Sequence, residues 1–136
     1  ALGLWGLRLD DGFSLDEAGA LAARMPIAVR ASTTTPAQAA ALAAAGPEVI
    51  AIHNFYPRPE TGLDPEFLRE STRMLQAAGM QVYAFIPGDQ QLRGPLYAGL
   101  PTLEAHRGAA PLAALADLAV HSGVDGIFAG DPGVSP

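Results

Sequence analysis

The sequence predicts an α/β domain built on a parallel sheet. Short apolar runs alternate with helical patterns along the 136 residues, which gives five candidate strands and four candidate helices. Parallel strands that are joined by helices produce this alternation. With 49% apolar residues, a chain of this length can build one hydrophobic core, so we expect a single domain.

The composition excludes several classes of partner and site. The net charge is -6, from 14 acidic and 8 basic residues, which argues against nucleic acid or an anionic membrane as a partner. The chain has no cysteine, so it has neither a disulfide nor a thiolate metal ligand. It also lacks a long apolar span and a signal-peptide pattern, so we expect a cytoplasmic protein. No cofactor is indicated, because no strand is followed by the glycine spacing of a nucleotide-binding loop.

Five apolar runs are too short for helices and are expected to form strands. The first run stops at Asp10 and Asp11, and the third stops at His53. The fourth and fifth lead into Pro-Gly-Asp and Gly-Asp-Pro-Gly turns. The expected strands are residues 4–9, 27–31, 49–52, 81–86 and 124–129.

Capping signals place four helices between these strands. Ser14 with Glu17, and Thr35 with Gln38, each match the pattern of a capping box. Asp64 is the expected N-cap of the third helix. The helices are expected over residues 15–24, 36–45, 65–78 and 111–121. The aromatic residues expected in the core are Trp5, Phe13, Phe67 and Phe85.

The loop after the third strand is the expected ligand mouth. It reads HNFYPRPETGL over residues 53–63, with polar and aromatic side chains beside two prolines. In helix-covered parallel sheets, the carboxyl ends of the strands open onto the ligand site. We therefore expect His53, Asn54, Tyr56 and Arg58 at this mouth. The long loop after the fourth strand is also expected to be functional, because loops of that length are uncommon in compact domains.

Five segments of the chain resemble the MupG-type 6-phospho-N-acetylmuramidases. They are LDDGF from residue 9, HNFYPRPETGL from residue 53, AFIPGD from residue 84, RGPLYAGLPTLEAHR from residue 93 and the closing Gly-Asp at residue 130. The resemblance runs through nearly the whole chain. One departure is Arg30, at a position where members of that family tend to have Asn.

The resemblance implies a glycoside hydrolase of bacterial cell-wall (peptidoglycan) recycling. Its substrate would be the disaccharide of 6-phospho-N-acetylmuramic acid and N-acetylglucosamine. The family has a (β/α)8 barrel of the TIM type, followed by a smaller cyclophilin-like domain. On that template, residues 1–136 are expected to form about the second half of the barrel, strands four to eight, because five strands are too few to close one. The first strands and the cyclophilin-like domain would be absent.

Glycoside hydrolysis needs two carboxyl groups, one to protonate the leaving oxygen and one as nucleophile or base. We predict that Asp10, at a strand end, and Glu104, in the long loop, are this catalytic pair. Asp10 and Asp11 point in different directions from an extended chain, and Asp10 is the one expected to face the reacting bond. The alternatives are a turn or capping role for the Asp pair and a surface role for Glu104.

A 6-phosphate carries about two negative charges and favours arginine forks or backbone amides. Barrels often bind phosphate in the loops after strands seven and eight, which here would hold Arg93, His106, Arg107 and Asp131. For His53, a buried hydrogen-bonding role is the alternative. The predicted substrate-binding residues are Asp11, His53, Asn54, Tyr56, Arg58, Arg93, His106, Arg107 and Asp131, and no metal ligand is predicted.

Two other functions stay open. A metal-dependent phosphosugar hydrolase or lyase would use Asp10, His53 and Asp131 as ligands, although the sequence has no close metal-binding motif. A non-catalytic carbohydrate-binding barrel fragment is the second. An incomplete barrel would also expose a sheet edge to which a second copy can bind, so self-association is an expected alternative to a monomer.

Overall fold

The computed structural model describes residues 3–46 and 48–135. The strands are β1 (Leu7–Arg8), β2 (Ile27–Arg30), β3 (Val49–Ile52), β4 (Gln81–Ile86) and β5 (Gly126–Ala129). The helices are α1 (Leu15–Ala22), α2 (Pro36–Ala45), α3 (Pro65–Ala77), α4 (Pro111–His121) and the 3-10 helix η1 (Glu104–His106). No helix in the described ranges is long and apolar enough to span a bilayer.

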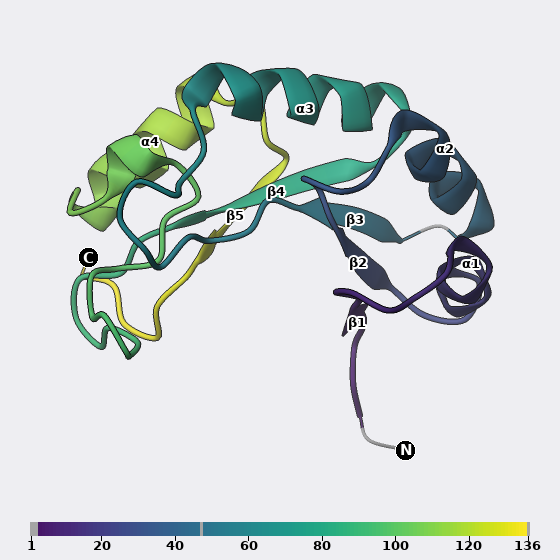
Figure 1. The fold of residues 1–136 in the computed structure, drawn as a ribbon, viewed down its shortest axis with the longest axis horizontal. Coiled ribbons are helices and arrows are strands. Elements are labelled where there is room, and N and C mark those ends of the chain that lie inside the picture. The colour runs from purple at the N-terminus through teal and green to yellow at the C-terminus, as the bar shows by residue number, and fades with distance from the viewer. Residues whose placement is uncertain (1–2, 47, 136) are drawn as a thin grey trace.

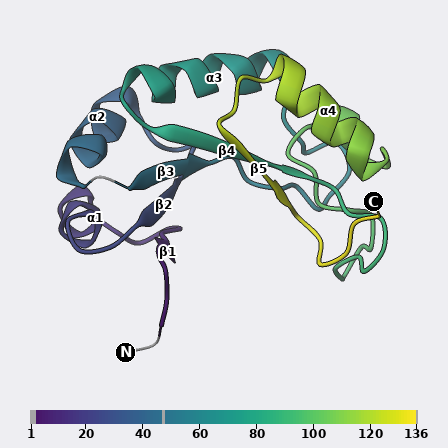
Figure 2. The same ribbon diagram turned by 180° about the vertical axis from the view of Figure 1, so that it is seen from behind.

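The strands form one parallel sheet in the order β1-β2-β3-β4-β5. The sheet is curved, and the four α-helices follow one another along its convex face (Figure 1). The opposite, concave face carries no helix in the described part of the chain, as the view from behind also shows (Figure 2). The arrangement is that of half a barrel.

The predicted fold class needs a correction. We expected a (β/α)8 barrel represented by strands four to eight, and the described residues instead form an open half-barrel whose five strands follow sequence order. Each neighbouring pair of strands is joined through a helix on the same face, so the five strands are linked by four β-α-β connections in the described part of the chain. This order does not identify the strands as numbers four to eight of a barrel.

The predicted helix starts are confirmed. The capping boxes of Ser14 with Glu17 and of Thr35 with Gln38 are both formed. Asp64 accepts a hydrogen bond from the backbone N–H of Glu66 at 2.8 Å, which caps α3. Such caps satisfy first-turn N–H groups that have no partner within the helix. They fix the direction in which each helix leaves its strand.

The core lies between the sheet and the helices. One cluster, which includes Leu9 and Val29, joins the first four strands to α1, α2 and α3. A second, which includes Ala84 and Leu118, joins β4 to α3 and α4. Because successive side chains of a strand point to opposite faces, the residues between these core positions face the concave side. This alternation decides which strand-end residues can meet a ligand there.

Three aromatic residues that we expected in the core are exposed. Trp5 is 73% exposed, Phe13 is 52% exposed and Phe67 is 49% exposed, so the prediction was wrong for them. Trp5 borders a cavity on the concave face, together with Tyr83 and Phe128, where no helix covers the sheet. Large apolar residues therefore lie on the uncovered face of the sheet as well as in the core, and the sequence does not distinguish the two positions.

Candidate functional site

A group of polar side chains gathers at the carboxyl ends of β1, β2 and β3. Arg8, Asp10 and Arg30 fall on the concave side by strand alternation. Arg8 Nε donates to Asp10 Oδ1 at 3.2 Å, and Arg8 Nη2 donates to Asn54 Oδ1. Arg30 Nη1 donates to Asp11 Oδ1 at 2.7 Å. These five residues form the strand-end cluster, which joins three strands through two arginines.

Tyr56 lies next to the strand-end cluster. Its backbone N–H donates to the carbonyl oxygen of Pro101 at 2.9 Å. This hydrogen bond holds the loop after β3 against the loop after β4. Burial raises the pKa of the phenol, and the positive charge of Arg30 opposes part of that rise. The phenol is therefore neutral at physiological pH and available as a hydrogen-bond donor close to Arg30.

His53 lies on the helix side of the sheet. Its side chain is fully buried, and its ring Nε2 is 3.3 Å from Thr72 Oγ1 of α3. Burial lowers its pKa from 6.5 to about 4, so the ring is neutral at physiological pH. His53 therefore does not join the strand-end cluster, and its contacts are those of a buried hydrogen-bonding residue.

The buried ring of His53 predicts a pH dependence of stability. Because the folded-state pKa of about 4 lies below the ordinary 6.5, the unfolded chain binds a proton between these values that the folded chain does not. The free energy of unfolding should therefore fall as the pH falls through this window, by about 2 kcal/mol at pH 5. Urea titrations of the wild type and of His53→Gln would measure it.

The control for this test is His121→Gln, because the side chain of His121 is 66% exposed. This variant should keep the pH dependence of the wild type, whereas His53→Gln should lose most of it. Equal slopes in wild type and His53→Gln between pH 7 and pH 5 would show that His53 is not the responsible group.

Glu104 anchors the loop that follows β3. Its two carboxylate oxygens accept from Arg107 Nε and Nη2, both at 2.6 Å. They also accept from the backbone N–H groups of Glu60 at 2.9 Å and Gly62 at 2.8 Å. Led by the Arg107 hydrogen bonds, these contacts lower the pKa of Glu104 to about 2. The carboxylate is thus ionised at neutral pH and is not poised to donate a proton.

Asp131 is also surrounded by backbone donors. The residue is 4% exposed, and its carboxylate accepts from the N–H groups of Gly88 at 2.9 Å, Arg93 at 3.0 Å and Leu100 at 2.9 Å. The end of β5 is thereby tied to the loop after β4. Asp131 therefore holds this loop through backbone hydrogen bonds, and Arg93 itself is an exposed residue.

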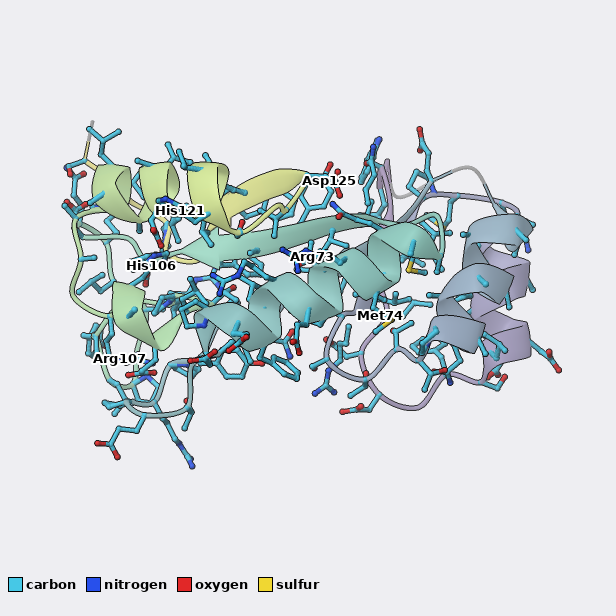
Figure 3. All side chains as sticks on the ribbon, turned by 90° about the horizontal axis from the view of Figure 1, so that it is seen from above. Arg73, Met74, His106, Arg107, His121 and Asp125 are labelled. Atoms are coloured by element: carbon cyan, nitrogen blue, oxygen red, sulfur yellow. The ribbon has the colours of Figure 1, made fainter. Side chains whose placement is uncertain are left out.

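The remaining predicted residues lie away from the strand-end cluster. His106 is buried, and its Nε2 is 2.8 Å from Asp117 Oδ2. Asp117 also contacts His121 Nδ1 at 2.9 Å, so the two histidines meet beside α4 on the helix side (Figure 3). Arg107 is engaged by Glu104, and Arg58 is exposed. The structure thus brings Asp10, Asp11, Asn54 and Tyr56 together and leaves the other predicted residues elsewhere.

The residues proposed for a metal do not converge. His53 contacts Thr72 on the helix side, and Asp131 is occupied by three backbone N–H groups. Across residues 3–46 and 48–135, no group of three or more His, Cys, Asp or Glu side chains is arranged to hold a metal ion.

The chain matches a model of a known protein family. The model described as "6-phospho-N-acetylmuramidase, N-terminal" (MupG_N) matches residues 1–136, which is the whole chain. The chain belongs to the MupG_N family. The resemblance seen in the sequence is thereby confirmed. No curated protein matched the chain.

Two solved structures share the fold of this MupG_N chain. A conserved protein of unknown function from a locus in Enterococcus faecalis is 44% identical, with a TM-score of 0.89, and the match covers 98% of this chain and 39% of that one. An uncharacterized protein from B. cereus is 26% identical, with a TM-score of 0.85, covering 98% of this chain and 41% of that one. The MupG_N chain thus spans about two-fifths of these relatives.

Sequence reasoning missed three residues of this MupG_N chain that build the site. Arg8 and Arg30 hold the strand-end cluster together, and their signal was a single arginine near the end of an otherwise apolar strand. Thr102 is fully buried, donates to the carbonyl oxygen of Asn54 at 3.0 Å and accepts from the N–H of Phe85 at 2.8 Å. No sequence signal marked Thr102 within its loop.

Proposed function

We propose that this protein takes part in hydrolysing the glycosidic bond between 6-phospho-N-acetylmuramic acid and N-acetylglucosamine. The observation that carries the proposal is the match of the whole chain to a family described as 6-phospho-N-acetylmuramidase. The strand-end cluster supports it, because it offers carboxylates, cationic groups and an amide, with the phenol of Tyr56 nearby, at the edge where parallel α/β folds bind ligands. A phosphate monoester carries about −1.5 to −2 charges at pH 7 and crosses membranes poorly, so we place the reaction in the cytoplasm.

Asp10 is the catalytic carboxylate in this proposal. Its side chain is 63% exposed on the concave side and makes one hydrogen bond with the described residues, at 3.2 Å from Arg8 Nε. Glycosidases place an ionised carboxylate where it can attack the anomeric carbon or activate water. An exposed carboxylate beside sugar-binding groups meets that need, whereas Asp131 is enclosed by backbone donors.

Turnover of the phosphorylated disaccharide tests the proposal. The substrate 6-phospho-N-acetylmuramic acid–β-1,4-N-acetylglucosamine would be given to this chain and to a longer protein that contains it, with the unphosphorylated disaccharide as control. Release of N-acetylglucosamine from the phosphorylated substrate by either protein is the expected result. Tight binding without any release would instead favour a carbohydrate-binding role. If the substrate is neither bound nor cleaved, the proposal is wrong.

Glu104 is the predicted catalytic partner of Asp10, and its contacts support a positioning role. An added side chain at Gly62 would lie 2.6 Å from the backbone nitrogen of Glu104, so the two segments are in close contact. Glu104→Gln breaks the ion pair with Arg107 at this contact. We expect KM to rise about tenfold through a loosened loop, with both limbs of the pH–rate profile retained.

The matched control for Glu104→Gln is Glu66→Gln, an exposed acid in the first turn of α3. Kinetics and thermal melts of both variants separate the two roles. If Glu104→Gln removes one limb of the pH–rate profile and lowers kcat about 100-fold at unchanged melting temperature, Glu104 is the acid/base group after all.

A further inference from the structure

The two arginines of the strand-end cluster are less exposed than their acidic partners. The side chains of Arg8 and Arg30 are 33% and 26% exposed, whereas those of Asp10 and Asp11 are 63% and 89% exposed. Each ion pair is made through one nitrogen and one oxygen. Exposed single-contact pairs contribute little, typically about 0–1 kcal/mol. The positive charges are thus held in place by the fold and only weakly neutralised.

Arg30 also carries a hydrogen-bond donor without an acceptor. Its Nε is buried and has no hydrogen-bond partner among the described residues, although a guanidinium offers five N–H donors in a fixed fork. Arg107 differs, because Nε and Nη2 both bind the carboxylate of Glu104 and only Nη1 lacks a partner. A buried donor without a partner is destabilising, so the protein leaves this guanidinium incompletely satisfied. A ligand would meet its Nη donors, of which Nη1 binds Asp11.

A cavity lies beside Arg30 at the carboxyl ends of β1 and β2. Its volume is about 120 Å³, enough for a small anionic group or a few water molecules. The polar residues that line it are Asp10, Ser14, Arg30, Thr33, Thr34 and Gln38. The phenol of Tyr56 is neutral, and it is close enough to Arg30 for the positive charge of Arg30 to lower its pKa. Cation, hydroxyl and amide groups therefore form one half of the lining of this small space. Apolar side chains form the other half: Leu9, Phe13, Leu15, Ala18, Val29 and Leu42.

Arg8 adds a second positive charge on the same face. In the register of the sheet Arg8 is opposite Ala28, so Arg30 is the next residue of β2 on that face. Arg8 already uses Nε and Nη2 to hold Asp10 and Asn54. It therefore positions the cluster and raises the local positive potential, while Arg30 keeps donors for a ligand.

We propose that Arg30, supported by Arg8, binds the anionic substituent of the sugar substrate in place of the carboxylate of Asp11. This inference rests on the proposed function and adds the residue that binds the negatively charged group of the substrate. Two substituents of the sugar fit, and both are small oxyanions. They are a phosphate monoester at C6 and the carboxylate of the lactyl ether. Arginine binds both in the same forked geometry. Asp11, which is 89% exposed, exchanges its one contact for solvent when the anion arrives.

Binding of three sugar probes tests the assignment without turnover. N-acetylglucosamine 6-phosphate carries only the phosphate, N-acetylmuramic acid carries only the carboxylate, and N-acetylglucosamine carries neither. Calorimetric or NMR titrations would compare wild type, Arg30→Met and, as a matched control, Arg24→Met, an exposed arginine beyond α1. We expect Arg30→Met to weaken one anionic probe at least tenfold and leave the neutral probe unchanged.

The anionic probe that Arg30→Met weakens identifies the source of the charge. Two further variants keep the test decisive if Arg30→Met does not fold. Arg30→Lys retains the charge without the fork and should still lose most of the affinity, whereas Asp11→Asn removes the competitor and should tighten the same probe a few-fold. Equal affinities of wild type and Arg30→Lys, or equal losses on all three probes, would overturn the assignment. Because no cleavage is measured, a failed turnover assay leaves this result standing on its own.

Discussion

Asp10→Asn is expected to lower turnover of the phosphorylated disaccharide about 1,000-fold. General acid–base and nucleophilic carboxylates contribute factors of this size, and an amide supplies neither function. The fold should tolerate the change, because the side chain of Asp10 is 63% exposed and has one contact, with Arg8. We expect the free energy of unfolding to change by less than about 1 kcal/mol. Turnover and urea titration of the same preparation would measure both effects.

The control for this prediction is Asp16→Asn, an exposed acid in the first turn of α1. It removes the same charge from a residue on a helix and should leave turnover within about twofold, because surface substitutions away from a site have small effects. If Asp10→Asn keeps more than a tenth of wild-type turnover, the catalytic carboxylate lies elsewhere and the proposed site loses its central residue.

Asp131→Asn is expected to destabilise the protein by about 3 kcal/mol. The carboxylate of Asp131 accepts from three backbone N–H groups at a position that is 4% exposed. An amide of the same shape has one carbonyl oxygen, and its NH2 group would face at least one of these donors. At least one buried N–H would then lose its acceptor, and the charge-assisted strength of the others would be lost too.

The matched control is Asp89→Asn in the neighbouring loop. Asp89 is exposed and accepts from the backbone N–H of Ser135 at 2.7 Å, so its replacement should change stability by less than about 1 kcal/mol. Chemical unfolding of both variants at pH 7 measures the difference. Similar midpoints for the two would show that Asp131 does not hold the loop after β4.

Local signals in the sequence predicted the helices and the edge of the sheet that carries polar groups. Ser14 with Glu17 and Thr35 with Gln38 determine their helix starts within four residues of chain, so no tertiary information is needed. The ends of β1 and β3 were placed in the same way, from apolar runs that stop at polar residues. Both kinds of signal act over short distances along the chain.

The direction of individual side chains was harder to predict. His53 directly follows β3 and was expected at the ligand mouth, but alternation turns it toward Thr72 and leaves the next residue, Asn54, on the concave side. A register error of one residue moves a side chain to the other face of a sheet. A buried histidine and a ligand-binding histidine look the same in sequence.

Contacts between distant residues were not predictable. Glu104 meets the N–H groups of Glu60 and Gly62, more than 40 residues earlier, only because the two loops lie side by side. Arg30 lies in an apolar strand, and nothing nearby in the sequence indicates Asp11 as its partner. These contacts depend on the curvature of the sheet and on how its strands are ordered, which no local pattern specifies.

The shortest strand of the sheet carries three members of the strand-end cluster on it or directly after it, namely Arg8, Asp10 and Asp11. β1 contains two residues, and the N–H groups of Leu7 and Leu9 bind the carbonyl oxygens of Pro26 at 3.0 Å and Ala28 at 2.8 Å. As an edge strand with so few bonds, it is the segment expected to open first by local unfolding. A ligand that bridges Arg8 and Arg30 would oppose that opening. Ligand binding should therefore slow hydrogen exchange at the backbone N–H of Leu9. Closing of this edge strand and binding of the ligand would then be coupled, so that each favours the other.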